Sequence, residues 1–388
     1  MRFYILDDLV SPASGRGLTV EDAQLAERDG PPAERCRLWC GRRGATPEDV
    51  TDAECARCGR IWIESGSLSD GEVRYPISAG IPRFVVESDA GVDADTQESF
   101  GYEWQHFDRV LPDYDAEIDN YFGIVPPDAL NDAVVLDAGC GMGRWALQIA
   151  KRPVRRLYAV DFSRAVDSAA KTLARQPKAH CVQADVTRLP FRSGAIDFTY
   201  CLGVLHHLDD PDAGMASLAR VTNGPLLVYL YYALDNRPTF HRVLLRVATA
   251  ARTVTARLPK HVMLWLSWAI AAVIYWPLAR FAHVLERLGN SRVAHQVPLS
   301  HYRSYSFKFM AGDAFDRFAT PIEKRYSKAQ IAAWLERYGR EASFSEHTPF
   351  WVSLGVPKSY RGAAGALDAS HGTGPDSRGT RDTATAQE

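Results

Sequence analysis

The fold of this chain is decided by the stretch Val134-Val135-Leu136-Asp137-Ala138-Gly139-Cys140-Gly141-Met142-Gly143. An apolar run ends in three alternating glycines, and a helix-like segment, 144–151, follows. Glycine lets the backbone turn tightly and approach a ligand closely, while the first turn of a helix offers unsatisfied N–H donors. The stretch predicts a nucleotide-binding turn, although on its own it is also compatible with a plain strand-to-helix turn.

Apolar strand-like runs then alternate with helical segments as far as residue 232. This alternation predicts an α/β fold, with a doubly wound, Rossmann-like parallel sheet covered by helices on both faces. Ligands of such open sheets bind at the carboxyl ends of the strands. The expected strands are 134–137, 156–160, 180–183, 196–201 and 226–231.

Acidic residues follow three of these strands. Asp161 lies 18 positions beyond Gly143, a spacing that suits a carboxylate binding the hydroxyls of a ribose. Asp185, after the next strand, is placed to accept from an exocyclic amine such as that of adenine. Together with Asp137 they would repel a pyrophosphate and would suit a sulfonium or ammonium cation.

These motifs resemble those of the class I S-adenosylmethionine-dependent methyltransferases, in particular the type 11 group. The resemblance implies that Gly139, Gly141 and Gly143 pass under the methionine part of S-adenosylmethionine, with Asp137 near its amino group. It implies further cofactor contacts at the next strand ends. There Asp161 would hold the ribose, Phe162 would flank the adenine, and Asp185 would bind the adenine amine beside the Val186 backbone and Leu202.

The segment Leu202-Gly203-Val204-Leu205-His206-His207-Leu208 resembles the one that carries substrate-facing histidines in this group. Methyl transfer is an in-line displacement, so positioning supplies much of the rate, and a base is needed only for a protonated acceptor. His207 or His206 is the candidate base. The alternative is that one of the pair packs or caps the helix after Asp210.

Four of the seven cysteines cluster before residue 60, as Cys36, Cys40, Cys55 and Cys58. Residues 36–85 resemble a small zinc ribbon of the Trm112-like type, although the first pair is spaced Cys-x3-Cys instead of Cys-x2-Cys. The resemblance implies one structural zinc ion held by four thiolates, which leave no open coordination position for catalysis. A metal-free β-hairpin with buried thiols is the alternative.

A mostly helical, arginine-bearing insertion separates the fifth strand from the end of the fold. Its segment 262–281 is almost wholly apolar, is interrupted by Pro277, and reaches the length that spans a bilayer. We expect a helical cap over the active site; the alternatives are an in-plane membrane-docking element and a re-entrant or spanning segment. The first two both predict an apolar acceptor.

The expected organisation assigns every part of the chain to a unit. The aromatic patch 100–107 at the start of the methyltransferase domain is expected either to pack on that domain or to form a lid. The units are an extension 1–35, the zinc-ribbon-like module 36–85, a linker 86–99, the methyltransferase domain 100–234 and 313–358, the insertion 235–312, and a disordered tail 359–388.

The formal net charge of −2 gives no global attraction to nucleic acid, and the first residues do not form a secretory signal. We therefore expect a cytoplasmic enzyme, either free or associated with a membrane, that methylates oxygen or carbon of a small apolar or lipid-like molecule. One rival is an RNA methyltransferase that uses the zinc module for recognition. Another is a non-catalytic scaffold that binds S-adenosylmethionine.

Overall fold

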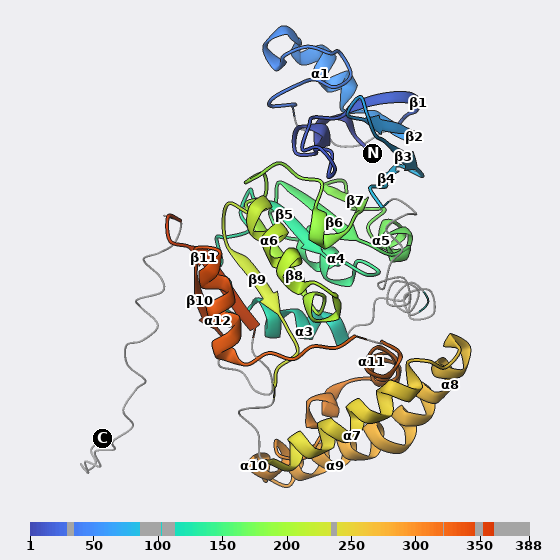
Figure 1. Ribbon diagram of the computed structural model, residues 1–388, viewed down its shortest axis with the longest axis vertical. Coiled ribbons are helices and arrows are strands. Elements are labelled where there is room, and N and C mark those ends of the chain that lie inside the picture. The colour runs from blue at the N-terminus through green and yellow to red at the C-terminus, as the bar shows by residue number, and fades with distance from the viewer. Residues whose placement is uncertain are drawn as a thin grey trace, which may run out of the picture.

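The computed structural model describes residues 1–28, 35–85, 102, 113–233, 239–320, 322–345 and 352–360. The predicted linker, the aromatic patch apart from Tyr102, and the predicted tail beyond residue 360 lie outside these residues. Three bodies follow one another along the long axis of the molecule: a small β module, an α/β domain, and a helical bundle (Figure 1).

The α/β domain is built on a seven-stranded sheet of order β10-β11-β9-β8-β5-β6-β7. Neighbouring strands from β5 to β9 are parallel, and β10 and β11 form an antiparallel pair at one edge. The prediction of an α/β fold with a mostly parallel sheet is confirmed. The strands are β5 (Val134–Ala138), β6 (Arg156–Asp161), β7 (Ala179–Gln183), β8 (Phe198–Leu202), β9 (Leu226–Tyr229), β10 (Arg340–Phe344) and β11 (Val352–Pro357).

Helices cover both faces of this sheet. Leu136 and its alternate neighbours in β5 pack against α6 (Pro211–Val221) and α12 (Lys328–Arg337), while Val135 faces the opposite core. That second core contains side chains of three further helices. They are α3 (Asp113–Phe122), α4 (Arg144–Ala150) and α5 (Ala165–Thr172).

The β module contains residues that were expected to form a separate extension. Its four antiparallel strands have the order β1-β2-β3-β4, and β1 pairs with β2. Residues 1–28 therefore belong to the module, which corrects the predicted boundary at residue 36. The elements are η1 (Phe3–Asp7), β1 (Thr19–Glu27), η2 (Pro47–Asp49), α1 (Asp52–Cys58), β2 (Ile61–Ser69), β3 (Arg74–Ser78) and β4 (Ile81–Pro82).

Buried polar contacts join the module to the edge of the large sheet. The Arg83 guanidinium donates to Gln183 Oε1 over 2.8 Å and to Asp167 Oδ1 over 2.6 Å. On the other side of the contact, Asp8 forms an ion pair with buried Arg156 and accepts from Tyr158 Oη over 2.6 Å. Charge-assisted hydrogen bonds of this kind fix the orientation of two packed surfaces.

The insertion is a bundle in which one long helix contains Pro277. Helices α8 and α9 are joined without a break through a π-helical turn, η6, which accommodates the proline that lacks an N–H donor. The elements are α7 (Thr239–Thr255), α8 (Lys260–Ile270), η6 (Ala271–Tyr275), α9 (Trp276–Arg287), α10 (Ser291–Ala294), η7 (Ser300–Ser304) and α11 (Phe307–Ala319).

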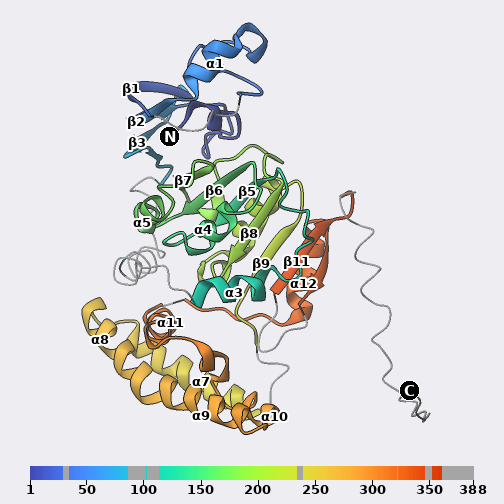
Figure 2. The ribbon, with the colours of Figure 1, turned by 180° about the vertical axis from the view of Figure 1, so that it is seen from behind.

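Helix α11 belongs to this bundle, because it packs on α8 and shares its apolar core. Figure 2 shows α7, α8, α9 and α11 side by side below the α/β domain. The α/β domain therefore resumes beyond residue 320, which corrects the predicted return at residue 313.

A buried charge cluster ties the insertion to the α/β domain. Glu323, 2% exposed in its side chain, forms ion pairs with Arg252 of α7 and, over 2.5 Å, with Arg325. Burial alone would raise the pKa of Glu323, but Arg325 and Arg252 hold it below its usual value.

We expect Glu323→Ala to lower the free energy of unfolding by about 3 kcal/mol, because it leaves two largely buried arginines without their common carboxylate. Urea denaturation measures the change. The matched control is Glu72→Ala, which removes an exposed pair with Arg16 and should cost less than about 1 kcal/mol. Equal effects of the two substitutions would contradict a structural role for the buried cluster.

Candidate active site

The glycine turn adopts a backbone that only glycine accommodates easily. Gly139, Gly141 and Gly143 have φ values of +84°, +54° and +82°, in the left-handed region. A Cβ atom at Gly139 would lie 2.2 Å from Val204 Cγ2, so this part of the turn also packs closely on the loop after β8. The turn lies at the carboxyl edge of the sheet, where the sequence placed it.

Asp161, at the end of β6, holds this turn in place. Its Oδ2 accepts from the Gly141 N–H over 2.8 Å, and its Oδ1 accepts from the Ser163 N–H and Oγ over 2.8 and 2.7 Å. Burial raises the pKa of Asp161, and these hydrogen bonds partly offset the effect. The Asp161 carboxylate is thus a hydrogen-bond acceptor held in a fixed position, and it lies on the wall of a cavity.

One cavity of about 740 Å³ extends from the glycine turn to the helical insertion. Predicted site residues from several strand ends meet on its wall, although they are far apart in the sequence. Those that line it are Gly139, Gly141, Asp161, Phe162, Asp185, Val186, Leu202 and His207. Their assigned contacts with a cofactor remain predictions.

Three predicted residues lie outside this lining, and the roles assigned to them remain predictions. Gly143 is the residue before α4 and packs toward Ala169 of α5. A Cβ atom added at Gly143 would lie 3.2 Å from the Ala169 Cα atom. Asp137 is buried within β5, behind the turn, with 2% exposure. His206 is completely buried and stacks on Tyr231 with 4.0 Å between ring centroids.

Burial raises the pKa of Asp137 to about 8, and the nearby Asp161 carboxylate contributes to the rise. A carboxyl group whose pKa is raised on folding stabilises the protein below its unfolded pKa, near 4, and loses that contribution as the pH rises through its folded pKa. We therefore expect Asp137→Asn to become more stable relative to the unaltered protein as the pH rises from about 4 to about 8, by up to about 1.4 kcal/mol for each pH unit.

Denaturant unfolding between about pH 5 and pH 9 measures this difference. Asp132→Asn is the control. Hydrogen bonding to Arg155 lowers the pKa of Asp132, so its contribution to stability is lost only below about pH 4, and the stability difference should not change over this pH range. A stability difference for Asp137→Asn that does not change with pH would contradict the assignment.

His207 faces the cavity and has a defined tautomer. Its Nδ1 lies 2.7 Å from the Ile322 carbonyl oxygen, which can only accept, so Nδ1 carries the hydrogen when the ring is neutral. Its Nε2 is then the basic nitrogen and lies 3.9 Å from Asp316 Oδ1. Tyr231 Oη donates to Asp316 Oδ2 over 3.0 Å, and burial raises the pKa of Asp316.

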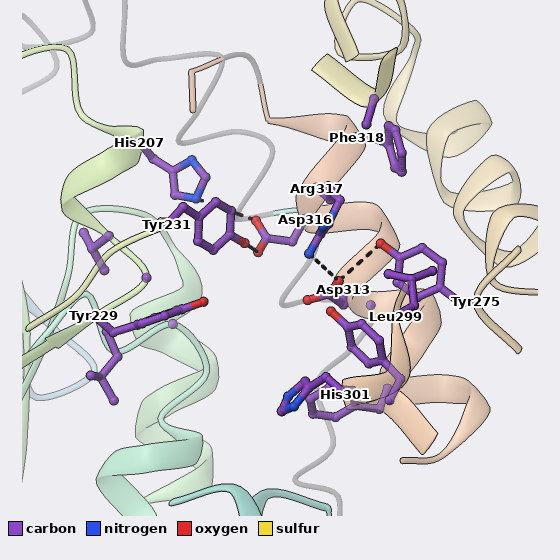
Figure 3. Close-up of a pocket in the computed structure, with 18 of the residues that line it drawn as sticks. His207, Tyr229, Tyr231, Tyr275, Leu299, His301, Asp313, Asp316, Arg317 and Phe318 are labelled. Atoms are coloured by element: carbon purple, nitrogen blue, oxygen red, sulfur yellow. Dashed lines mark hydrogen bonds and ion pairs between the residues drawn. The ribbon is translucent and has the colours of Figure 1, made fainter. Parts of the chain in front are cut away.

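Two walls face each other across this part of the cavity. In Figure 3, His207, Tyr229 and Tyr231 project from the α/β domain, and Asp313, Asp316 and Arg317 project from the insertion. Asp313 lies 3.5 Å from Arg317 and accepts from Tyr275 Oη over 3.4 Å. The insertion thus supplies a polar wall opposite the predicted base.

The sequence did not single out this polar wall, although it carried a signal for it. Asp313, Asp316 and Arg317 share one face of the otherwise largely apolar helix α11, at a spacing of three and four residues. A polar stripe on such a helix indicates that this face of the helix lies toward either solvent or a polar cavity. Since Arg252 and Glu323 anchor the insertion to the α/β domain, this stripe faces the cavity.

Polar residues of the insertion also line the cavity away from this stripe; they are His241, Thr255, Ser300, His301 and Lys308. The largest apolar part of the wall is formed by side chains from one face of α7 and from the middle of the long helix. They are Leu244, Leu245, Val247, Ala248, Ala251, Leu266, Ile270, Ile274 and Leu278. The cavity therefore has a polar part between the glycine turn and α11 and a largely apolar part along α7 and the long helix.

The four N-terminal cysteines line one small hollow of the β module. Burial raises the pKa of Cys36 to about 12, and the neighbouring thiols contribute. Cys55 and Cys58 lie on helix α1, which begins at a capping box between Thr51 and Glu54, and not on a hairpin knuckle. Among the described residues no group of three or more potential ligands is arranged to hold a metal ion, so the zinc-ribbon prediction is not confirmed.

Residues 136–225 match the family model described as "Methyltransferase domain". The chain therefore contains a methyltransferase domain, and this part of the prediction is confirmed. The match covers the glycine turn, the strand ends that line the cavity, and His207.

An uncharacterized protein of Synechococcus sp. is 36% identical to this chain over 108 residues, which are 26% of this chain and 25% of that protein. The chain thus spans about a quarter of the length of this relative. What the whole protein methylates is accordingly a matter for proposal.

The chain is similar to solved methyltransferase structures only at low sequence identity and low TM-score. Magnesium protoporphyrin IX methyltransferase from Synechocystis PCC 6803 is 15% identical, with a TM-score of 0.38, over 68% of this chain and 99% of that chain. The 1,6-didemethyltoxoflavin-N1-methyltransferase of Burkholderia thailandensis is 13% identical, with a TM-score of 0.40, over 76% and 96%. At these scores the similarities do not indicate an acceptor.

Proposed function

We propose that this protein is an S-adenosylmethionine-dependent methyltransferase that methylates an oxygen or carbon atom of a small, largely apolar molecule. The observation that carries the proposal is the single cavity that joins the glycine turn, the base candidate His207 and an apolar wall. Gly139, Gly141 and Asp161 would hold the cofactor, which supplies an electrophilic methyl group.

The protein's own contribution is to place the acceptor and to take up its proton. When bound, S-adenosylmethionine would supply a methyl group whose bond to sulfur breaks as the bond to the acceptor atom forms, and the electron pair of the broken bond would stay with the neutral thioether. A hydroxyl acceptor loses its proton to His207 Nε2, and Asp316, 3.9 Å away, stabilises the resulting imidazolium. The buried Tyr231–Asp316 hydrogen bond fixes the carboxylate for this role.

The direct test is incubation with methyl-labelled S-adenosylmethionine and extracts of lipids and small molecules, followed by mass spectrometry. We expect a labelled product that partitions into the organic phase. A parallel incubation with total RNA, if it alone takes up label, would favour the rival RNA methyltransferase. Cofactor binding without transfer to any fraction would favour the non-catalytic scaffold.

We also propose that the four cysteines of the β module hold one structural zinc ion, whose binding would bring their thiols closer together than they are in this structure. The support is their convergence on one hollow, together with the preference of Zn²⁺ for thiolate ligands. Cys36, Cys40, Cys55 and Cys58 would have to lose their protons, so binding would weaken at acidic pH.

Metal analysis of the purified protein should find about one zinc per chain. Cys55→Ser should remove it and lower the melting temperature by several degrees, whereas the control Cys181→Ser, in β7, should keep it. The metal site would be contradicted if the purified protein contains no zinc and its stability does not change when zinc is added.

A further inference from the structure

The bundle presents an apolar face to solvent. One helix in the part of the chain that the structure describes, Lys260–Arg287, is long and apolar enough to cross a membrane, yet only 28% of its most apolar window is buried. Trp265 is 77% exposed, Val273 74%, and Val247 of the neighbouring α7 65%. Large apolar side chains gathered at such exposure mark an interaction surface.

The opposite face of the long helix is already occupied. Met263, Ser267, Ala271, Tyr275 and Ala279 are buried at intervals of four residues, and α8 and η6 pack on α11. The helix therefore cannot be surrounded by lipid on all sides without separating from the cavity wall. The arrangement suits a helix that lies in the plane of an interface.

The charge of this region identifies the kind of surface. Residues 239–306 contain nine arginines and lysines and one acid, Glu286, a formal charge of +8 in a chain whose net charge is −2. Arg303 pairs with that acid over 2.8 Å. Five arginines of this region are exposed. They lie in α7, just after α7, in α9 and in α10, and are Arg242, Arg246, Arg257, Arg287 and Arg292. Arginine beside exposed tryptophan and aliphatic side chains is the pattern of helices that bind anionic lipid surfaces.

Some apolar side chains of the cavity wall are themselves exposed. Leu244, Val247 and Ile274 line the cavity and are also 52%, 65% and 46% exposed. An apolar molecule held in a bilayer would thus meet a continuous apolar path to the polar part of the site, without crossing water.

We propose that the outward face of α7 and the Lys260–Arg287 helix docks on an anionic bilayer and that the cavity takes its acceptor from that bilayer. The evidence for the docking surface is the set of exposed apolar side chains and the positive charge. The entry of the acceptor from the bilayer depends on the proposed function. The acceptor is then an amphiphile, with a hydroxyl or an acidic carbon at its head and an apolar body along α7.

Flotation with lipid vesicles tests the docking surface in the full chain. We expect binding to phosphatidylcholine vesicles that contain about 30% phosphatidylglycerol, weakened by salt, and little binding to phosphatidylcholine alone. The double variant Trp265→Glu, Val273→Glu should lose at least about tenfold in affinity, and Arg242→Glu, Arg246→Glu should lose the preference for anionic lipid. The matched control is Leu25→Glu, at a 50% exposed apolar side chain of the β module, and it should bind like the unaltered protein.

Calorimetric titration with S-adenosylmethionine separates this proposal from the proposed function, because all these variants should retain cofactor binding. Failure of the unaltered protein to bind anionic vesicles would overturn the docking surface, as would equal binding by the Trp265→Glu, Val273→Glu variant. If light scattering shows that the unaltered protein is a dimer and that this variant is a monomer, the face is an interface with a second copy of the chain. If the unaltered protein binds RNA but not vesicles, and substitutions on this face abolish the RNA binding, the face binds nucleic acid.

Discussion

Replacing His207 by alanine is expected to lower the rate of methyl transfer by about 10²- to 10⁴-fold while leaving the affinity for S-adenosylmethionine unchanged. His207 lines the part of the cavity between the glycine turn and α11, and the Ile322 carbonyl holds its tautomer so that Nε2 is the basic nitrogen. Removal of this group leaves the positioning of the reactants but no acceptor for the proton. Transfer of labelled methyl groups into organic-soluble product measures the rate.

Two further variants separate proton transfer from packing. His207→Asn keeps an N–H near the Nδ1 position for the Ile322 carbonyl and removes the base, so it should be as impaired as His207→Ala. His206→Phe keeps the stacking on Tyr231 and should stay within a few-fold of the unaltered rate, because His206 is buried outside the cavity. A His207→Ala variant that keeps nearly the full rate would contradict the role of base.

The second large effect is expected at the glycine turn. Gly139→Ala should weaken the binding of S-adenosylmethionine by at least about tenfold and lower the stability by about 1–3 kcal/mol. The added methyl group would lie 2.2 Å from Val204 Cγ2, so the turn and the loop after β8 must move apart. Calorimetry measures the affinity, and denaturant unfolding measures the stability.

Gly289→Ala is the matched control for backbone strain. Gly289 has a φ of +81°, close to the +84° of Gly139, but a Cβ atom there meets nothing within 4 Å. This substitution should cost stability without changing cofactor affinity. An equal loss of affinity in both variants would show that the effect of Gly139→Ala does not come from the site.

The α/β domain could be predicted because its signals are local. Each of the five parallel strands is an apolar run of a few residues, and the carboxyl ends of parallel strands lie along one edge of the sheet whatever their separation in the chain. Asp161 and Asp185 therefore reached the cavity wall as expected. Helix α12 likewise begins at a local signal, the capping box of Ser327 and Gln330.

The errors arose where a residue's environment depends on distant parts of the chain. His206 and His207 are indistinguishable in sequence, and it is the packing of Tyr231 and residue 322 that turns only His207 into the cavity. The strand β1 escaped notice because its exposed and half-buried residues do not alternate regularly, and a register shift interrupts its pairing with β2. The resemblance implied a place for Asp137 near the amino group of the cofactor; its side chain is buried and does not line the cavity, which the sequence does not indicate.

The central claim is that the glycine turn and the acids around it bind S-adenosylmethionine, and calorimetric titration of the full chain tests it most directly. The account predicts saturable binding at one site per chain, weakened by Gly139→Ala and by Asp161→Ala, which removes the acceptor that holds Gly141. Gly289→Ala should bind like the unaltered protein. The absence of binding, or binding that Gly139→Ala and Asp161→Ala leave unchanged, would contradict the account.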